Sequence, residues 1–156
     1  MLLFLIFTAA VLLGERYIKA HIRAAAPHTL PRTFLKGHVR LEHAENTGFS
    51  ASRLADRPET VQLVSALAAI VGFLSLIPEL IRRRKDGLFQ LGAGLFMGGS
   101  LANLSDRIFR GSVTDYLRFP TLPWKKIRSL IFNLADLCLF LGAALMLLRI
   151  LFPKKK

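Results

Sequence analysis

The sequence predicts a mainly α-helical, polytopic membrane protein with four transmembrane helices and a small extracytoplasmic β element between helices 1 and 2. Hydrophobic residues make up 53% of the 156 residues, charged residues only 21%, and the mean hydropathy is +0.43. Because a helix needs roughly 20 mostly apolar residues to cross a bilayer, the chain has room for three or four crossings and one modest loop. We therefore expect one membrane-embedded domain over residues 1–156 and no large soluble catalytic domain.

Four apolar stretches carry the predicted spans. The first has no basic segment before it, and Glu15 and Lys19 lie between it and the small residues 24–26, an order opposite to that of a cleavable signal peptide. We therefore expect a retained first helix. The predicted transmembrane helices are residues 2–21, 61–81, 88–107 and 129–152.

Residues 23–59 form the extramembrane segment that we expect to be long enough to fold. Apolar Val39 and Leu41 alternate with polar neighbours from His38 to Glu42, and this period of two is typical of a short strand. The Asn-Thr-Gly sequence at 46–48 then provides a turn signal. The segment predicts a small β element on the membrane surface.

The charge distribution predicts the orientation and the partners. Lysine and arginine outnumber aspartate and glutamate by 22 to 10, which gives a formal charge of +12. In a chain with long apolar stretches, anionic lipid headgroups are better partners for this charge than nucleic acid. The basic clusters 82–85 and 154–156 lie directly beside spans, although the two segments expected outside hold more lysine and arginine in total. This density favours cytoplasmic N- and C-termini.

The third apolar stretch is rich in small residues. Gly94 and Gly98 form a GxxxG pattern, a spacing that allows two helix backbones to approach closely in lipid. The pattern predicts close helix packing and nothing more specific.

The cysteine and histidine content gives no sign of a metal or cofactor site. A single cysteine, Cys138, excludes an internal disulfide framework and a multi-cysteine metal site, and we expect it to be a small packing residue. His38 and His43 lack an accompanying HExxH or paired-cysteine pattern and are expected to be solvated loop residues.

Two acidic residues stand out because of their position. Asp136 lies inside the fourth apolar stretch, one turn after Asn133, where a charged aspartate costs roughly 2.5 to 3.5 kcal/mol at a helix centre. Asp115 follows the third helix and is expected at the same outer membrane face. Two carboxylates in a poorly hydrated site do not both ionise readily, so one holds a proton while the other acts as a base. From the residues alone, a catalytic pair and a structural or proton-carrying pair remain equally open.

Two further polar pairs lie one helical turn apart. Asn103 and Arg107, with Asp106 beside them, can position a substrate or orient a carboxylate, or they serve only to hold helices together. Glu15 and Lys19 can form a charge-compensated contact on one helix face, or they belong to a solvated helix end.

The order and spacing of residues 98–107, 111–116 and 132–136 resemble those of the lipoprotein signal peptidase family, signal peptidase II, which are bacterial integral-membrane aspartyl proteases. The resemblance implies that Asp115 and Asp136 are the catalytic aspartates. It also implies supporting or substrate-binding roles for Asn103, Arg107, Asn133, Asn46, Gly48, Lys19 and Glu15, of which Asn46, Gly48 and Lys19 rest on shorter matches.

The resemblance further implies a substrate, a location and a mode of action. The substrate is a diacylglyceryl-modified prolipoprotein that is cleaved before its lipidated cysteine. No metal or organic cofactor is implied. We expect a monomer in the bacterial inner membrane, surrounded by membrane lipids, with its active site near the outer face.

Three departures from the family pattern bear on substrate binding. Glu15 stands where the pattern has Asp, Ala102 replaces a usual Gly, and residues 49–51 (Phe-Ser-Ala) replace Ala-Ala-Phe. The alternative function is a non-catalytic four-helix membrane protein that binds lipid or a partner and uses the aspartates structurally. A small proton-coupled carrier is disfavoured because the chain shows no inverted halves.

Overall fold

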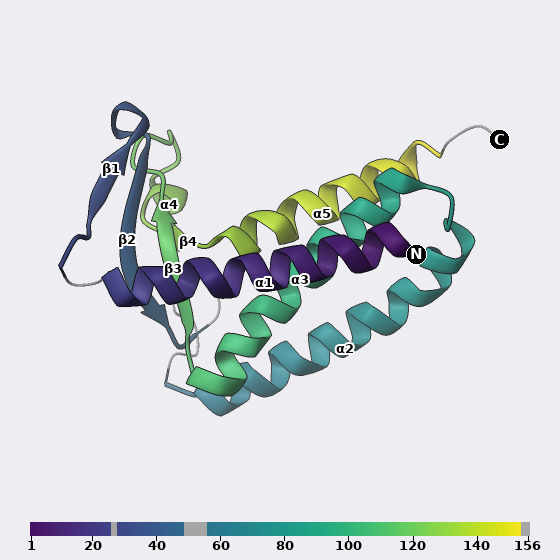
Figure 1. The fold of residues 1–156 in the computed structure, drawn as a ribbon, viewed down its shortest axis with the longest axis horizontal. Coiled ribbons are helices and arrows are strands. Elements are labelled where there is room, and N and C mark those ends of the chain that lie inside the picture. Colours follow the sequence, from purple (N-terminus) through teal and green to yellow (C-terminus); the bar gives the residue numbers. More distant parts are fainter. Residues whose placement is uncertain (26–27, 49–55, 154–156) are drawn as a thin grey trace.

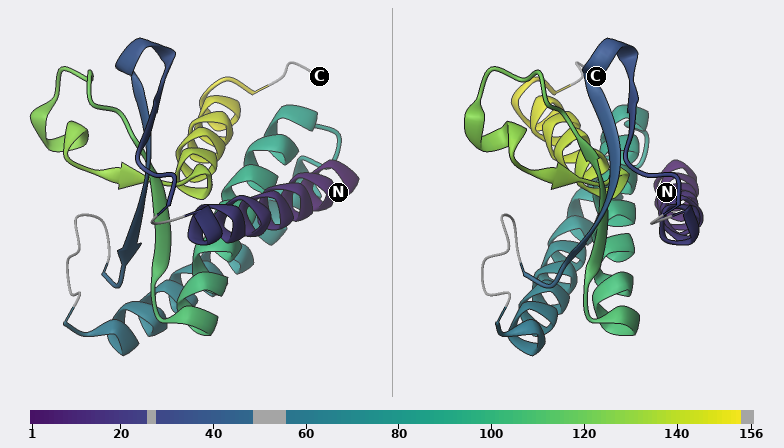
Figure 2. Two further views of the ribbon diagram at one scale, coloured as in Figure 1. Left: turned by 60° about the vertical axis from the view of Figure 1, so that its left-hand side comes forward. Right: turned by 90° about the vertical axis from the view of Figure 1, so that its left-hand side faces the viewer.

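The computed structural model describes residues 1–25, 28–48 and 56–153. Long helices run side by side, and a small sheet lies at the end of the molecule where α1 ends and α5 begins (Figures 1 and 2). In chain order the elements are α1 (Leu2–Ala25), β1 (Arg32–Phe34), the 3₁₀ helix η1 (Leu35–Gly37), β2 (Val39–Asn46), α2 (Pro58–Arg82), α3 (Gly87–Arg110), β3 (Val113–Arg118), α4 (Lys125–Arg128), β4 (Ile131–Phe132) and α5 (Leu134–Leu151).

Helix α3 packs between α1 and α5, and glycines allow the close approach on both sides. Gly94 and Gly98 face α1, where a Cβ on Gly98 would lie only 2.7 Å from the Cβ of Val11. Gly99 faces α5, where a Cβ would lie 2.5 Å from the carbonyl oxygen of Ala135. The close packing predicted from the GxxxG pattern is therefore confirmed, and its partner is α1.

Helix α2 packs more loosely on the bundle and exposes a large apolar surface, including Leu63, Leu67, Ile70 and Leu74. An exposed apolar surface of this kind marks contact with lipid or with another protein. Within the described residues, two helices are long and apolar enough to cross a membrane by length and composition: Glu59–Arg82 and Leu134–Leu151. The fold is mainly helical, as predicted.

The sheet has the strand order β1-β2-β3-β4, and all neighbours are antiparallel. Strand β3 begins soon after α3 because Gly111 ends the helix with a left-handed φ of 75°. In the register of β2 with β3, Ala44 lies opposite Asp115 and Glu45 lies opposite Thr114. Since successive side chains of a strand point to opposite faces, Asp115 and Thr114 lie on different faces of the sheet.

The structure corrects the predicted boundaries. The fourth helix begins at Leu134, so the prediction of helix over 129–133 was wrong. These residues include β4 and the helix-capping residue Asn133. The predicted strand is longer than expected and ends at Asn46. The turn predicted at 46–48 is present, because Asn46 Oδ1 accepts from the backbone N of Gly48, as in an Asx turn. The first and third helices extend to Ala25 and Arg110, beyond their predicted ends.

Candidate active site

Asp115 and Asp136 line the same small pocket. Asp115 lies within β3, and its side chain is 5% exposed. Asp136 lies half-buried in the first turn of α5. The pocket has a volume of about 120 Å³ and is also lined by Asn103 and Arg107 from α3 and by Asn46 from β2. The structure therefore brings together five residues that the sequence predicted to share a site.

Two asparagine side chains connect the two acids. Asn133 Nδ2 donates to Asp115 Oδ1 at 2.7 Å, and Asn133 Oδ1 accepts from the backbone N of Asp136 at 2.9 Å. Asn103 Nδ2 donates to Asp136 Oδ1 at 2.8 Å. Asn133 Nδ2 also donates to Asn103 Oδ1 at 3.2 Å. Each carboxylate is thus held by a neutral amide donor, and both amides are buried.

Asn133 can contact both acids because it is the N-cap of α5. Its side chain accepts from the third helical residue, Asp136, whose carboxylate Oδ2 in turn accepts from the backbone N of Asn133 at 3.1 Å. This reciprocal arrangement is a capping box, which fixes the first turn of a helix. The local sequence Asn-x-x-Asp thereby determines where Asp136 points.

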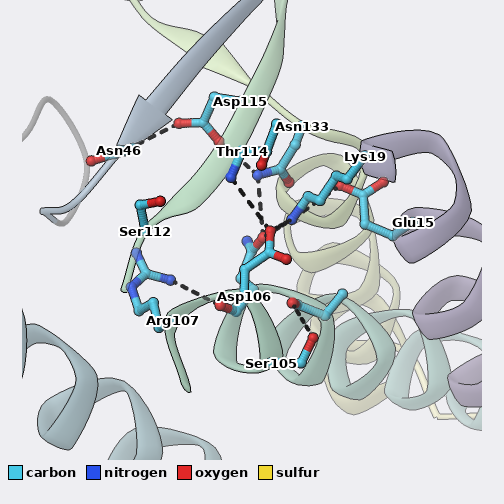
Figure 3. A network of polar contacts seen from close by, with 12 residues as sticks. Glu15, Lys19, Asn46, Ser105, Asp106, Arg107, Ser112, Thr114, Asp115 and Asn133 are labelled. Atoms are coloured by element: carbon cyan, nitrogen blue, oxygen red, sulfur yellow. Dashed lines mark hydrogen bonds and ion pairs between the residues drawn. The ribbon is translucent and has the colours of Figure 1, made fainter. Parts of the chain in front are cut away.

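A buried cation lies behind the amides. Lys19 from α1 is 1% exposed, and its Nζ lies 2.8 Å from Asp106 Oδ2, 2.9 Å from Asn103 Oδ1 and 3.5 Å from Glu15 Oε1 (Figure 3). The predicted contact between Glu15 and Lys19 is present. Since both side chains are buried, the alternative of a solvated helix end is wrong.

The outer segment is fastened to the pocket through the end of β2. Asn46 Nδ2 donates to Asp115 Oδ2 at 3.1 Å, and Asn46 Oδ1 accepts from the backbone N of Gly48 at 3.1 Å. Arg107 Nη2 donates to the carbonyl oxygen of Gly48 at 3.1 Å. The altered residues 49–51 lie outside the described residues.

The surroundings of Asp115 make its ionisation less favourable than that of an exposed aspartate. Burial, and after it the neighbouring Asp136 carboxylate, raises the pKa of Asp115 from 3.8 to about 6, although hydrogen bonds from Asn46 and Asn133 and the charge of Lys19 act in the opposite direction. A carboxyl group with this pKa can hold or release a proton close to neutral pH, as general acid–base chemistry requires.

The other candidate groups lie apart from this pair. His38 contacts Thr121, and His43 contacts Glu45. Cys138 is a buried free thiol on α5. No group of three or more His, Cys, Asp or Glu in the described part of the chain is placed to hold a metal ion.

Comparison with known proteins identifies the family. The model of the signal peptidase (SPase) II family matches residues 7–152. The chain belongs to the signal peptidase II family. Relatives of this signal peptidase II chain include a lipoprotein signal peptidase of Latilactobacillus sakei subsp. sakei, which is 28% identical over 99% of this chain and 97% of the relative. Another, from Syntrophomonas wolfei subsp. wolfei, is 30% identical over 94% of this chain and 91% of the relative.

A solved structure described as a bacterial membrane enzyme is similar to this signal peptidase II chain, with a TM-score of 0.80 at 18% identity, covering 97% of this chain and 94% of that one. The likeness shows that the two share a fold. Family membership makes the present chain a membrane-bound protease. The resemblance inferred from the three sequence segments is confirmed.

Sequence reasoning missed two contacts of this signal peptidase II chain. It placed Asp106 beside the site but did not predict its ion pair with Lys19. It also left out Tyr116, whose hydroxyl donates to Glu15 Oε2 at 2.8 Å and accepts from the backbone N of Leu134 at 3.1 Å. The sequence held no local signal for this second contact, because Glu15 and Tyr116 are 101 residues apart.

Proposed function

We propose that this chain is an aspartic-type endopeptidase that removes signal peptides from diacylglyceryl-modified prolipoproteins by cleaving before the lipidated cysteine. The observation that carries the proposal is the shared pocket of Asp115 and Asp136, joined by the side chain of Asn133. The names of the relatives, lipoprotein signal peptidases, supply the substrate class.

The two acids have different roles in peptide-bond hydrolysis. The ionised carboxylate takes a proton from a water molecule, which attacks the scissile carbonyl carbon. The protonated carboxyl donates a hydrogen bond to the carbonyl oxygen and supplies the proton that the leaving nitrogen needs. Asn133 and Asn103 hold the carboxylates during this exchange. The pair titrates as a unit, so the proton belongs to both acids.

The pocket wall suits a substrate that arrives from the lipid. Beside the acids it is lined by apolar side chains: Leu130, Ile131, Phe132 and Phe140. These side chains can cover the apolar residues of a signal peptide, whereas the acids and amides face the peptide bond. In this proposal α1, α2, α3 and α5 all cross the membrane, both termini lie in the cytoplasm and the sheet lies at the outer face. The enzyme works as a monomer without a cofactor.

Exposed residues next to the sheet agree with an interfacial position. Trp124 is 63% exposed and directly precedes α4, whose sequence Lys-Lys-Ile-Arg is strongly basic. Tryptophan and basic side chains are favoured at the level of lipid headgroups. The opposite end of the bundle contains the basic cluster 82–85, which favours the cytoplasm.

The decisive experiment uses a synthetic lipobox peptide that carries a diacylglyceryl cysteine, with purified protein in detergent or liposomes. Asp115→Asn and Asp136→Asn are each expected to lower kcat by at least about 1,000-fold, because each removes a group that handles protons. The matched control is Asp56→Asn, because the Asp56 side chain is 80% exposed and its carboxylate is not buried. It should cleave at the wild-type rate.

Mass spectrometry of the products locates the cleaved bond, and thermal unfolding shows whether each variant is folded. Cleavage on the N-terminal side of the modified cysteine supports the proposed specificity. Retained cleavage by both single Asn variants would refute the proposed mechanism. A wild-type protein that never cleaves, with Asn variants that lose thermal stability, would instead favour the non-catalytic alternative.

A further inference from the structure

We propose that Tyr116 is a positioning residue of this peptidase: its hydroxyl, together with the Glu15 carboxylate, fixes the first turn of α5 and thereby the position of Asp136 relative to Asp115. The proposal rests on the proposed function, because it assigns a task within the same site. It concerns a residue outside the pocket that acts on the two acids through the backbone.

The geometry of the hydroxyl carries the proposal. Tyr116 OH donates to Glu15 Oε2 at 2.8 Å and accepts from the backbone N of Leu134 at 3.1 Å. Leu134 is the first residue of α5, two positions before Asp136. The first amide groups of a helix have no partner within the helix, so a hydroxyl that accepts from one of them fixes the helix start. One oxygen atom therefore joins α1, β3 and α5.

Strand alternation explains why this contact couples the two acids. Asp115 and Tyr116 are neighbours in β3, with Asp115 lining the pocket and Tyr116 on the other face. Asn133 connects Asp115 with the start of α5 on the pocket side. Tyr116 makes a second connection between the same strand and the same helix on the opposite side. Two connections on opposite sides of a strand restrain rotation of that strand against the helix.

Glu15 holds the hydroxyl in its place. Its carboxylate is completely buried and lies near the backbone amide of Ala135 at the N-terminal end of α5. A negative charge at a helix N-terminus is favourable, because the unpaired amides carry a partial positive charge. Lys19 lies on the other side of the same carboxylate, at 3.5 Å.

The hydroxyl stays a hydrogen-bond donor under all relevant conditions. Burial, and then the charge of Glu15, raises the pKa of Tyr116 well above its ordinary value of 10. The Tyr116 side chain is only 3% exposed, so bulk water cannot readily replace a lost hydroxyl. Phenylalanine at this position would fill the same space but leave the Leu134 amide without this acceptor.

The test compares Tyr116→Phe with Tyr17→Phe, using steady-state cleavage of the diacylglyceryl lipobox peptide. Tyr17 is the chain's other tyrosine and is 67% exposed on α1, so it is a matched control for loss of a hydroxyl. We expect Tyr116→Phe to lower kcat by about 10- to 100-fold with KM within about twofold, because a small displacement of Asp136 harms chemistry more than binding. Tyr17→Phe should match the wild type.

A purely structural role is distinguished by the double-mutant cycle with Leu134→Pro. Leu134 is the first helical residue after the N-cap Asn133, a position that accepts proline, so this variant removes the amide that donates to the Tyr116 hydroxyl and leaves the helix start in place. We expect each single variant to lower kcat and the double variant to be no slower than the slower single, since both changes break one contact. Independent, multiplying losses in kcat would overturn the proposal. A lower melting temperature with unchanged kcat below that temperature would also overturn it.

The remaining outcomes are also decisive. If Tyr116→Phe does not fold, Leu134→Pro decides alone: a lowered kcat at unchanged KM supports the proposal, and an unchanged kcat overturns it. Wild-type protein that does not cleave the peptide would refute the proposed function before any variant is compared, and the positioning role would fall with it. Cleavage by the wild type with a fully active Tyr116→Phe refutes the positioning role alone.

Discussion

Gly99→Ala is the substitution that we expect to affect the site most strongly from outside it. A Cβ at this position would lie 2.5 Å from the carbonyl oxygen of Ala135, whereas ordinary contact begins at 3.4 Å. The first turn of α5 therefore has to move by roughly 1 Å to restore ordinary van der Waals separation. Ala135 directly precedes Asp136, so the catalytic carboxyl of the proposed mechanism moves with it.

A displacement of this size predicts a large loss of rate. Misplacing a reacting group by about 1 Å can cost on the order of 100-fold in rate. Overpacking of the interface costs a further 1 to 3 kcal/mol, roughly, in stability. We therefore expect Gly99→Ala to lower kcat by about 100-fold and to lower the melting temperature in detergent.

The assay is cleavage of the diacylglyceryl lipobox peptide, measured below the melting temperature of each variant. Gly14→Ala is the control, because a Cβ at Gly14 meets no heavy atom within 4 Å among the described residues. Both variants add one methyl group to a helix, so only the position of that group differs. A Gly99→Ala protein with wild-type kcat and melting temperature would show that the helix start tolerates the displacement, and would refute the reasoning.

Two further predictions concern buried charges. The pKa of Asp115 is raised from 3.8 to about 6, so the folded protein binds more protons than the unfolded chain between these values and loses stability as pH rises through that window. Asp115→Asn removes this loss, so the free energy of unfolding of the variant should exceed that of the wild type by up to about 3 kcal/mol at pH 7 but not at pH 3.5. Urea or thermal unfolding measures both proteins at the two pH values. If the variant and the wild type are equally stable at pH 7 as well as at pH 3.5, the prediction is contradicted. Lys19→Met leaves the buried carboxylates of Glu15 and Asp106 without their cation and should lower stability by roughly 3 to 5 kcal/mol. Lys36 is exposed, so Lys36→Met should melt like the wild type. Matching melting curves for the two lysine variants would show that the ion pairs contribute nothing.

The sequence was sufficient to place the acids near one another because each lies at a recognisable helix end. Asp115 follows the third helix, and Asp136 lies one turn after Asn133 at the start of the fourth. In an antiparallel succession of helices, these two ends lie at the same side of the bundle. The pocket brings both residues together with Asn103 and Arg107, which also lie at the end of a helix.

The sheet was harder to predict because its pairing is long-range and the sequence of β3 shows no regular alternation. In Val-Thr-Asp-Tyr-Leu-Arg, two polar residues, Thr114 and Asp115, stand side by side, so polar and apolar side chains do not follow a period of two. Its partner β2 lies almost 70 residues earlier in the chain, as the pairing of Asn46 with Val113 illustrates. The sequence of β3 therefore indicates neither the bounds of the strand nor the strand that pairs with it.

The start of α5 was predicted five residues too early, and the reason is local. Residues 129–132 are mostly apolar, so hydropathy alone cannot separate them from the helix that follows. The Asn-x-x-Asp spacing of residues 133–136 marks the true start, because it forms the capping box. Hydrogen-bonding capacity was a better guide to this boundary than apolar character.

The amide of Asn103 separates the buried ammonium group from the acid pair by one layer. Its oxygen accepts from Lys19, and its nitrogen donates to Asp136. Lys19 therefore orients a neutral dipole toward the carboxylate instead of forming an ion pair with it. In the proposed mechanism, a proton can then enter or leave the acid pair without breaking a strong ionic contact. The residues that exchange protons are therefore different from the neighbouring residues that carry the fixed charges.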